Sequence, residues 1–182
     1  MMLDEIQTGI GRTGKLFAFQ HNDIIPDVCT LAKALGNGVP IGACLAKGVA
    51  ATILTAGKHG STFGGNLLAC SAALAVLNTL EEENLIEQVS HKAQSIVDGL
   101  ISALQANPHV VDIRHKGLMI GVELDRPCGE LVKLALEKQL LINVTNEKTI
   151  RLLPPLIIDE QQIQQLIETL VLLITDYTTA LE

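Results

Sequence analysis

The sequence is poor in aromatic side chains and in positive charge. Aromatic residues make up 2% of the 182 residues and tryptophan is absent, so the hydrophobic core has to be aliphatic. Lys and Arg number 13 against 20 Asp and Glu, which gives a formal net charge of −7. A protein with this acidic balance is not expected to bind nucleic acid or an anionic membrane surface.

Long apolar runs, paired cysteines and internal repeats are also missing. The longest apolar runs are far shorter than the roughly 20 residues of a transmembrane helix, and we expect no signal peptide. The four cysteines are scattered, without a CxxC pair or a histidine at metal-ligand spacing. This pattern predicts no metal site and reduced core cysteines in a cytoplasmic protein. With 48% hydrophobic and 18% charged residues, the composition is that of a globular chain with one sizeable core or two small ones.

A single lysine, Lys33, stands between an apolar run and a glycine-rich loop. Residues 28–31 are predicted to form a short buried strand, and Ala32 and Ala34 leave space on either side of the amine. A pocket that excludes water disfavours the ammonium form, and the neutral amine is the form that attacks a carbonyl carbon. Lys33 is therefore a candidate Schiff-base lysine, and the alternative is a surface lysine beside an ordinary loop. The glycines of the loop are Gly36, Gly38 and Gly42.

Asp4 follows a short apolar strand at the start of the chain, and a glycine-rich loop over residues 8–14 follows it. In α/β sheets the carboxyl ends of strands are the usual place for site residues. Asp4 is therefore a second candidate, with a loop-start or capping aspartate as the alternative.

The polar loop at residues 59–66 precedes a predicted helix and contains two adjacent hydroxyl residues, Ser61 and Thr62. Backbone N–H groups, the helix dipole and the Thr62 hydroxyl would all favour a phosphate at this position. The alternative is a plain helix N-cap formed by Ser, Thr or Asn66.

Arg151 is the lone arginine of a β-type stretch near the C-terminus. Burying a guanidinium is costly unless it meets an anion, so a carboxylate partner is expected. The alternative is an arginine on an edge strand that points into water.

Periodicity and turn residues predict the remaining elements. Residues 1–80 are expected to form an α/β part, 81–107 a connecting helix, and 108–182 a small α+β unit. The strand at 41–45 is apolar throughout, as buried parallel strands tend to be. The further predicted helices are 47–54, 67–80, 85–104, 130–138 and 159–178, and the further predicted strands are two segments within 110–124 hinged at Gly117, then 140–144 and 149–153.

Four motifs, in this order and spacing, resemble class-III pyridoxal-phosphate aminotransferases. They are Asp4–Gly14 (DEIQTGIGRTG), Pro26–Ala43 (PDVCTLAKALGNGVPIGA), His59–Asn66 (HGSTFGGN) and Ile150–Ile158 (IRLLPPLII). The resemblance spans essentially the whole chain but only about the C-terminal half of the family protein. It implies an α/β fold: part of the large domain of a type-I aminotransferase, with a mainly parallel sheet, followed by a small C-terminal α+β domain.

The resemblance also implies roles around the cofactor pyridoxal 5′-phosphate. Lys33 would form the Schiff base and then move the proton between the substrate carbon and the cofactor. Asp4 would pair with the protonated pyridine nitrogen, and Gln7 would hydrogen-bond near the phenolic oxygen. Thr62 would hold the phosphate of the neighbouring subunit, so a homodimer is expected.

On the substrate side, the resemblance assigns Ser61 to the acyl-ornithine and Arg151 to the α-carboxylate of glutamate or 2-oxoglutarate. Within the family the chain most resembles the enzymes that move the δ-amino group of N-acetylornithine to 2-oxoglutarate, a step of arginine biosynthesis. Ornithine, succinylornithine or another ω-amino acid is the alternative substrate.

Two departures from the family pattern are visible. Leu67 stands where proline commonly follows the Gly-Gly-Asn motif. The part of the family protein without a counterpart here supplies the main phosphate cup, the aromatic residue that stacks on the cofactor, and a second substrate arginine. The chain is therefore expected to be the catalytic-lysine half of an aminotransferase, inactive alone, or a non-catalytic remnant that folds and oligomerises without cofactor.

Overall fold

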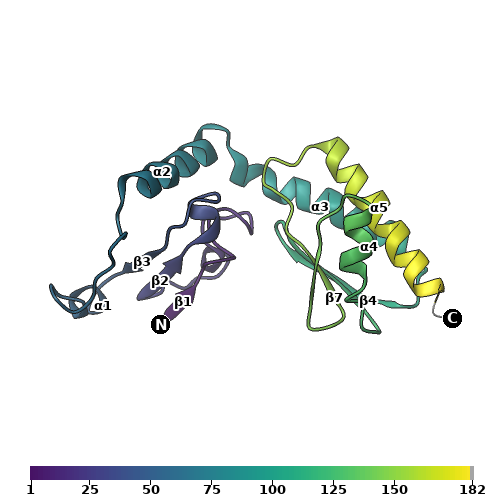
Figure 1. Ribbon diagram of the computed structural model, residues 1–182, viewed down its shortest axis with the longest axis horizontal. Helices are drawn as coiled ribbons and strands as arrows, with labels where there is room; N and C mark the ends of the chain where they lie inside the picture. The colour runs from purple at the N-terminus through teal and green to yellow at the C-terminus, as the bar shows by residue number, and fades with distance from the viewer. Residues whose placement is uncertain (181–182) are drawn as a thin grey trace. The chain divides into compact units, whose positions relative to one another are not determined.

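A three-stranded sheet organises the first of the two units into which the chain divides, residues 1–87 (Figure 1). The computed structural model describes residues 1–180. Strand β1 (Met2–Asp4) pairs in parallel with β2 (Val28–Leu31), which pairs antiparallel with β3 (Ala43–Ala46). The strand predicted at residues 28–31 is confirmed.

The prediction for β3 was wrong in direction and in burial. This strand runs antiparallel to β2 and is largely exposed, so in this stretch the sheet is mixed rather than mainly parallel. A parallel return needs a crossover of a dozen or more residues, usually with a helix. Residues 32–42 contain only the short 3₁₀-helix η2 (Lys33–Leu35), which turns the chain straight back along β2.

The longest helix that lies wholly in the first unit is α2 (Leu67–Glu82), as predicted. Asn66 caps its N-terminus, because the Asn66 side chain accepts a hydrogen bond from the N–H of Ala69 at 2.9 Å. The shorter helices are η1 (Ala18–His21) and α1 (Ala50–Ile53), the latter within the helix predicted at 47–54.

The second unit, from residue 88 onward, is built on a four-stranded antiparallel sheet with strand order β4-β5-β7-β6. Gly117, at a φ of 53°, makes the turn between the first two strands, as predicted. The strands are β4 (Val110–Lys116), β5 (Met119–Leu124), β6 (Asn143–Thr145) and β7 (Thr149–Leu152).

Three helices accompany this sheet, and their predicted positions are confirmed: α3 (Leu85–Leu104), α4 (Leu131–Glu137) and α5 (Glu160–Thr179). Asp159 caps α5 in a reciprocal arrangement with Gln162. One apolar core fills the unit with aliphatic side chains of α3, the sheet, α4 and α5. Its largest fully buried members are Ile96, Leu100, Leu104, Leu118, Ile120, Leu124, Leu131, Ile150, Leu170 and Ile174.

The four cysteines are free, and they do not all lie in the core. Cys29 and Cys128 are buried and Cys70 is half-buried, but Cys44 is exposed because β3 is. None of the helices within residues 1–180 has both the length and the apolar character needed to cross a membrane.

Candidate active site

The structure brings Asp4 and Lys33 to the same edge of the first sheet. Asp4 is the last residue of β1, and its register partner on the parallel strand β2 is Thr30. Lys33 follows Thr30 by three residues as the first residue of η2. Asp4 therefore ends one strand, and Lys33 follows the end of the parallel strand next to it, at the sheet edge where sites in α/β sheets usually lie.

Lys33 has a strained backbone. Its φ is +46°, in the left-handed region that residues other than glycine seldom adopt. Strained residues of this kind cluster at functional sites, where the surrounding structure holds them. The side chain itself is exposed in the described chain, so the water-excluding pocket expected around Lys33 is not formed by these residues.

The turn after Lys33 depends on glycine at position 36. The N–H of Gly36 donates to the carbonyl of Lys33 at 3.1 Å, and the N–H of Val39 donates to the carbonyl of Gly36 at 3.0 Å. A Cβ at position 36 would lie 2.1 Å from the Val39 carbonyl oxygen and 2.8 Å from Ile41. The tight turn thus fixes the backbone that follows η2 and requires a residue without a side chain at position 36.

Asp4 opens the loop that follows β1. Its Oδ1 accepts a hydrogen bond from the N–H of Ile6 at 2.9 Å, and the side chain is exposed. This bond fits the loop-start alternative and leaves the carboxylate at the sheet edge. Gln7 is half-buried in the same turn. Their roles toward a cofactor stay predictions.

Glu5, the neighbour of Asp4, was not among the predicted site residues. Glu5 is only 3% exposed, and its carboxylate accepts hydrogen bonds from the Thr8 hydroxyl and from the N–H groups of Ala18 and Phe19. The sequence feature that could have pointed to Glu5 is Thr8, a hydroxyl residue three positions after this acidic residue at the start of a loop.

The buried thiol of Cys29 on β2 lies close to these carboxylates. Burial raises the pKa of the Cys29 thiol, and the negative charges of Glu5 and Asp4 raise it further. Cys29 therefore stays protonated at neutral pH, and a protonated thiol is a poor nucleophile.

Ser61 and Thr62 lie in a stretch whose residues are all exposed, from position 51 to position 68. Asn66, not Ser61 or Thr62, caps α2, so capping does not occupy either hydroxyl. Gly64 folds against Ser61, since a Cβ at position 64 would lie 3.0 Å from the Ser61 Cβ. The role of Thr62 toward a phosphate stays a prediction.

Arg151 lies in the second unit, on β7 between β5 and β6. The edge-strand alternative is therefore wrong, because β7 is an interior strand and the Arg151 side chain is half-buried. Its Nη2 donates to Oδ1 of Asn143 on β6 at 3.4 Å. Its register partner on β5 is Gly121, which has no side chain to cover it. The expected carboxylate partner stays a prediction.

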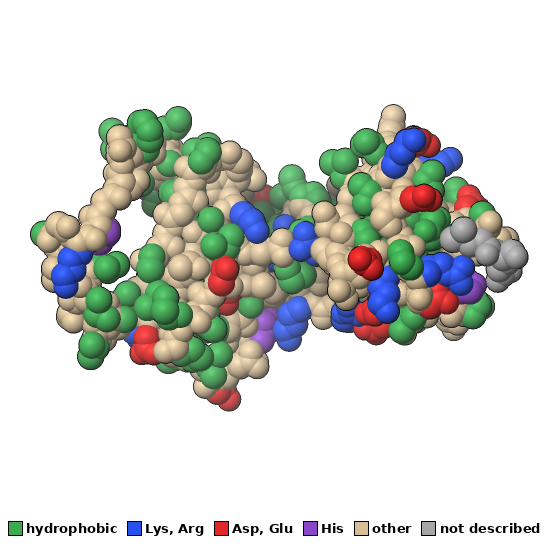
Figure 2. All heavy atoms as spheres, turned by 60° about the horizontal axis from the view of Figure 1, so that its bottom comes forward, with side chains coloured by type: hydrophobic (Ala, Val, Ile, Leu, Met, Phe, Trp, Pro, Cys, Tyr) green, Lys and Arg blue, Asp and Glu red, His purple; other side chains and the backbone are tan. Residues whose placement is uncertain are grey.

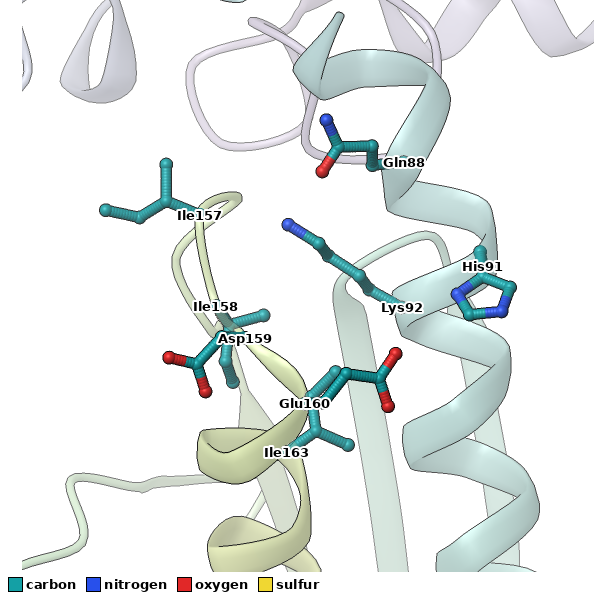
Figure 3. A pocket seen from close by; sticks show the side chains of 8 residues that line it. All are labelled: Gln88, His91, Lys92, Ile157, Ile158, Asp159, Glu160 and Ile163. Atoms are coloured by element: carbon teal, nitrogen blue, oxygen red, sulfur yellow. The ribbon is translucent and has the colours of Figure 1, made fainter. Parts of the chain in front are cut away.

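A cavity of about 410 Å³ opens in the second unit between the start of α3 and the segment that leads into α5 (Figure 3). Lys92 extends from α3 toward this segment and donates a hydrogen bond to the carbonyl of Leu156 at 2.8 Å. The cavity walls also carry Asp159 and Glu160, so charges of both signs surround it. None of the residues predicted for the site lines this cavity.

Sequence relatives with known names match nearly the whole chain. Acetylornithine aminotransferase 1 of Bordetella pertussis is 51% identical over 177 residues, which cover 97% of this chain and 45% of that protein. Acetylornithine aminotransferase of Nitrosomonas europaea is 50% identical over 175 residues, 96% of this chain and 44% of that protein. The chain thus spans less than half the length of these relatives.

Solved structures agree with the sequence relatives. Ornithine aminotransferase of Toxoplasma gondii superposes with a TM-score of 0.92 at 33% identity, covering 98% of this chain and 44% of that one. Acetylornithine aminotransferase of Elizabethkingia anophelis gives a TM-score of 0.88 at 35% identity, covering 96% and 45%. The family description "Aminotransferase class-III" matches residues 1–174. The chain therefore belongs to the class-III aminotransferases.

Proposed function

We propose that this chain supplies the catalytic lysine of a pyridoxal-phosphate-dependent aminotransferase. The main supporting observation is that Asp4 and the strained Lys33 both lie at the carboxyl ends of two neighbouring parallel strands. Membership of the class-III family supports this cofactor. So does a structural neighbour, an ornithine aminotransferase from T. gondii that was crystallised with partial occupancy of pyridoxal phosphate at its active site.

The donor set of the first unit fits the cofactor. The amine of Lys33 would bind its aldehyde carbon, and the Asp4 carboxylate would hold a proton on its ring nitrogen. Gln7 would bind near the phenolic oxygen. When bound, the cofactor supplies an electron-withdrawing ring that stabilises a carbanion. With the cofactor bound, the Lys33 amine would accept the proton from the substrate carbon and hold it.

Part of the cofactor site has to be formed by residues other than Lys33, Asp4 and Gln7. Thr62 and Ser61 lie in a fully exposed segment, which is suited to reach a second copy of the chain, where Thr62 would hold the phosphate and Ser61 would contact the substrate. The part of the relatives that this chain does not match would supply the remaining contacts.

N-acetylornithine is the amino donor we propose, with 2-oxoglutarate as acceptor. The sequence relatives that reach 51% and 50% identity are named acetylornithine aminotransferase, while among the solved structures the acetylornithine and ornithine aminotransferases are about equally similar, at 35% and 33% identity. Arg151 would bind the α-carboxylate of glutamate or 2-oxoglutarate, because a planar guanidinium matches a carboxylate in two hydrogen bonds. Ornithine is the second candidate amino donor, because the ornithine aminotransferase of T. gondii superposes on this chain with a TM-score of 0.92.

The test is a chimera in which this chain replaces the matching segment of the Bordetella pertussis relative. We expect the chimera to form glutamate from N-acetylornithine and 2-oxoglutarate, and to do so faster than from ornithine. The chain alone, supplied with the same substrates and pyridoxal phosphate, should give background rates. Precise positioning of cofactor and substrate is worth roughly 7–11 kcal/mol in favourable cases, and one lysine with one ring-nitrogen partner cannot provide it.

The Lys33→Ala chimera is the matched control and should be inactive. Equal turnover in the Lys33→Ala chimera would contradict the role of Lys33. Turnover by the chain alone within the usual enzyme range of about 1–10³ per second would show that no further segment is needed.

A further inference from the structure

Glu5 is a buried carboxylate between two residues that the proposed function assigns to the cofactor, Asp4 and Gln7. It is 3% exposed. Burying a carboxylate is costly unless its oxygens accept hydrogen bonds, and the Glu5 oxygens accept several.

The side chain of Glu5 joins two loop segments. Oε1 accepts a hydrogen bond from the N–H of Phe19 at 2.9 Å, and Oε2 accepts one from the N–H of Ala18 at 3.1 Å. The hydroxyl of Thr8 also donates to Oε2. Hydrogen bonds to an ionised acceptor are about twice as strong as neutral ones, so the carboxylate fixes η1 and the turn after β1 to each other.

The backbone of Glu5 fixes the same turn to the sheet. Its N–H donates to the carbonyl of Thr30 on β2 at 3.0 Å, and its carbonyl accepts from the N–H of Gly9 at 2.9 Å. A Cβ at position 9 would lie 2.7 Å from that carbonyl oxygen, so the turn is tightly closed. Thr30 is three residues before Lys33. The turn and Lys33 are thus both attached to strand β2.

We propose that Glu5 is a positioning residue that aims Asp4 and Gln7 at the cofactor. The inference rests on the proposed function. Asp4 is exposed and its one described bond goes to the N–H of Ile6 within the same turn, so its orientation follows the turn. Gln7 is part of the turn. The carboxylate of Glu5 is what holds the turn to η1, and without it the two cofactor contacts lose their fixed directions.

Glu5→Gln tests the proposal in this chain. The side chain keeps its size, but one acceptor oxygen becomes an NH₂ donor that faces a hydrogen-bond donor. Glu5→Gln weakens the charge-assisted hydrogen bonds that hold the turn to η1. Without cofactor, we therefore expect the amides of Ile6 and Gly9 within that turn to exchange at least about tenfold faster. Exchange in β5 of the second unit should not change. With pyridoxal phosphate, the dissociation constant from its absorbance should rise by about tenfold.

Two further variants complete the experiment. Glu82→Gln changes an exposed carboxylate on α2 and should leave both readouts unchanged. Thr8→Val removes one donor to Glu5 and keeps the carboxylate, so it should shift both readouts in the same direction by less. It also provides a milder change if Glu5→Gln fails to fold.

The outcomes separate this inference from the proposed function. Unchanged exchange at Ile6 and Gly9 in both variants overturns the role of Glu5, whether or not cofactor binds. Faster exchange with an unchanged cofactor dissociation constant also overturns it, because Glu5 would then serve the fold alone. If the unmodified chain does not attach cofactor at Lys33, that result counts against the proposed function, and faster exchange in Glu5→Gln then shows only that Glu5 holds the turn.

Discussion

Two neighbouring carboxylates, Asp4 and Glu5, have opposite surroundings, and the difference determines what each can do. Glu5 is buried and its oxygens are occupied by donors from its own unit. Asp4 is exposed at the strand end. A saturated buried carboxylate supports structure, whereas an accessible one can meet a ligand. One dipeptide thus combines a buried carboxylate that holds the turn with an exposed one that a ligand can reach.

Asp125 gives a prediction for pH dependence. Arg126 Nε donates to its Oδ1 at 2.8 Å and His109 Nδ1 lies 2.9 Å from its Oδ2. Arg126, and then His109, holds the pKa of Asp125 well below its usual range. A carboxyl group whose pKa is lowered by folding stabilises the native state above its unfolded pKa of about 3.9, and this contribution is lost as pH falls through the folded pKa.

We therefore expect Asp125→Asn to lower the free energy of unfolding at pH 6. The difference in the free energy of unfolding between this variant and the unmodified chain should become smaller from about pH 4 downward. Urea unfolding followed by the fluorescence of Tyr177, the single tyrosine, reports on the second unit. Glu137→Gln, an exposed carboxylate on α4, is the control. If the difference in the free energy of unfolding stayed constant from pH 6 to about pH 3, the stabilising role of the ionised Asp125 would be refuted.

The sequence was enough to place Asp4 and Lys33 at the ends of strands, because a recognisable apolar run precedes each of them. It was not enough to find Glu5, whose partners Ala18 and Phe19 lie 13 and 14 residues away and act through backbone N–H groups. Backbone donors carry no signature in the side-chain pattern. The exposure of Lys33 was also missed, since burial of one residue depends on chain that is distant in sequence.

At the scale of elements, the long helices were predictable and one strand was not. Helices α3 and α5 show strong apolar periodicity, and Asp159 with Gln162 marks the start of α5. Strand β3 has an apolar sequence that suggested a buried parallel strand. The length of the connection at residues 32–42, rather than the strand's composition, sets its direction.

The turn in this connection gives a second prediction. Gly36→Ala should destabilise the β2–β3 pair by about 1–3 kcal/mol, because a new Cβ overpacks against fixed atoms, here the Val39 carbonyl oxygen at 2.1 Å. Amide exchange of β2 and β3 measures the loss. The matched control is Gly60→Ala, where a Cβ meets no atom within 4 Å. If the amides of β2 and β3 were equally protected from hydrogen exchange in the two variants, the turn would be able to accommodate the new Cβ and the prediction would be wrong.

At the scale of the molecule, the two units bury apolar side chains to different extents. The second unit encloses a continuous aliphatic core. The first leaves large apolar side chains in contact with water, and Figure 2 shows many of them on its surface. The most exposed in this unit are Leu67 at 86%, Val49 and Phe63 at 80%, and Met2 and Leu68 at 73%.

Exposed apolar surface of this extent predicts self-association of the isolated chain. We expect sedimentation at micromolar concentration to show a dimer or larger species. The double variant Leu67→Glu, Leu68→Glu should shift the distribution toward monomer, because it places charge on the exposed apolar side chains. Val111→Glu, at an exposed position on β4 of the second unit, is the control and should not. A monodisperse monomer of the unmodified chain would rule out the prediction.

Reductive trapping tests most directly that this chain carries the catalytic lysine of a class-III aminotransferase. The purified chain is incubated with pyridoxal phosphate, reduced with borohydride and mapped by peptide mass. We predict that the label is confined to the peptide containing Lys33 and disappears in Lys33→Ala. Label spread evenly over Lys47, Lys58 and Lys92 would contradict the role of Lys33, because it would show that Lys33 binds the cofactor no differently from other lysines.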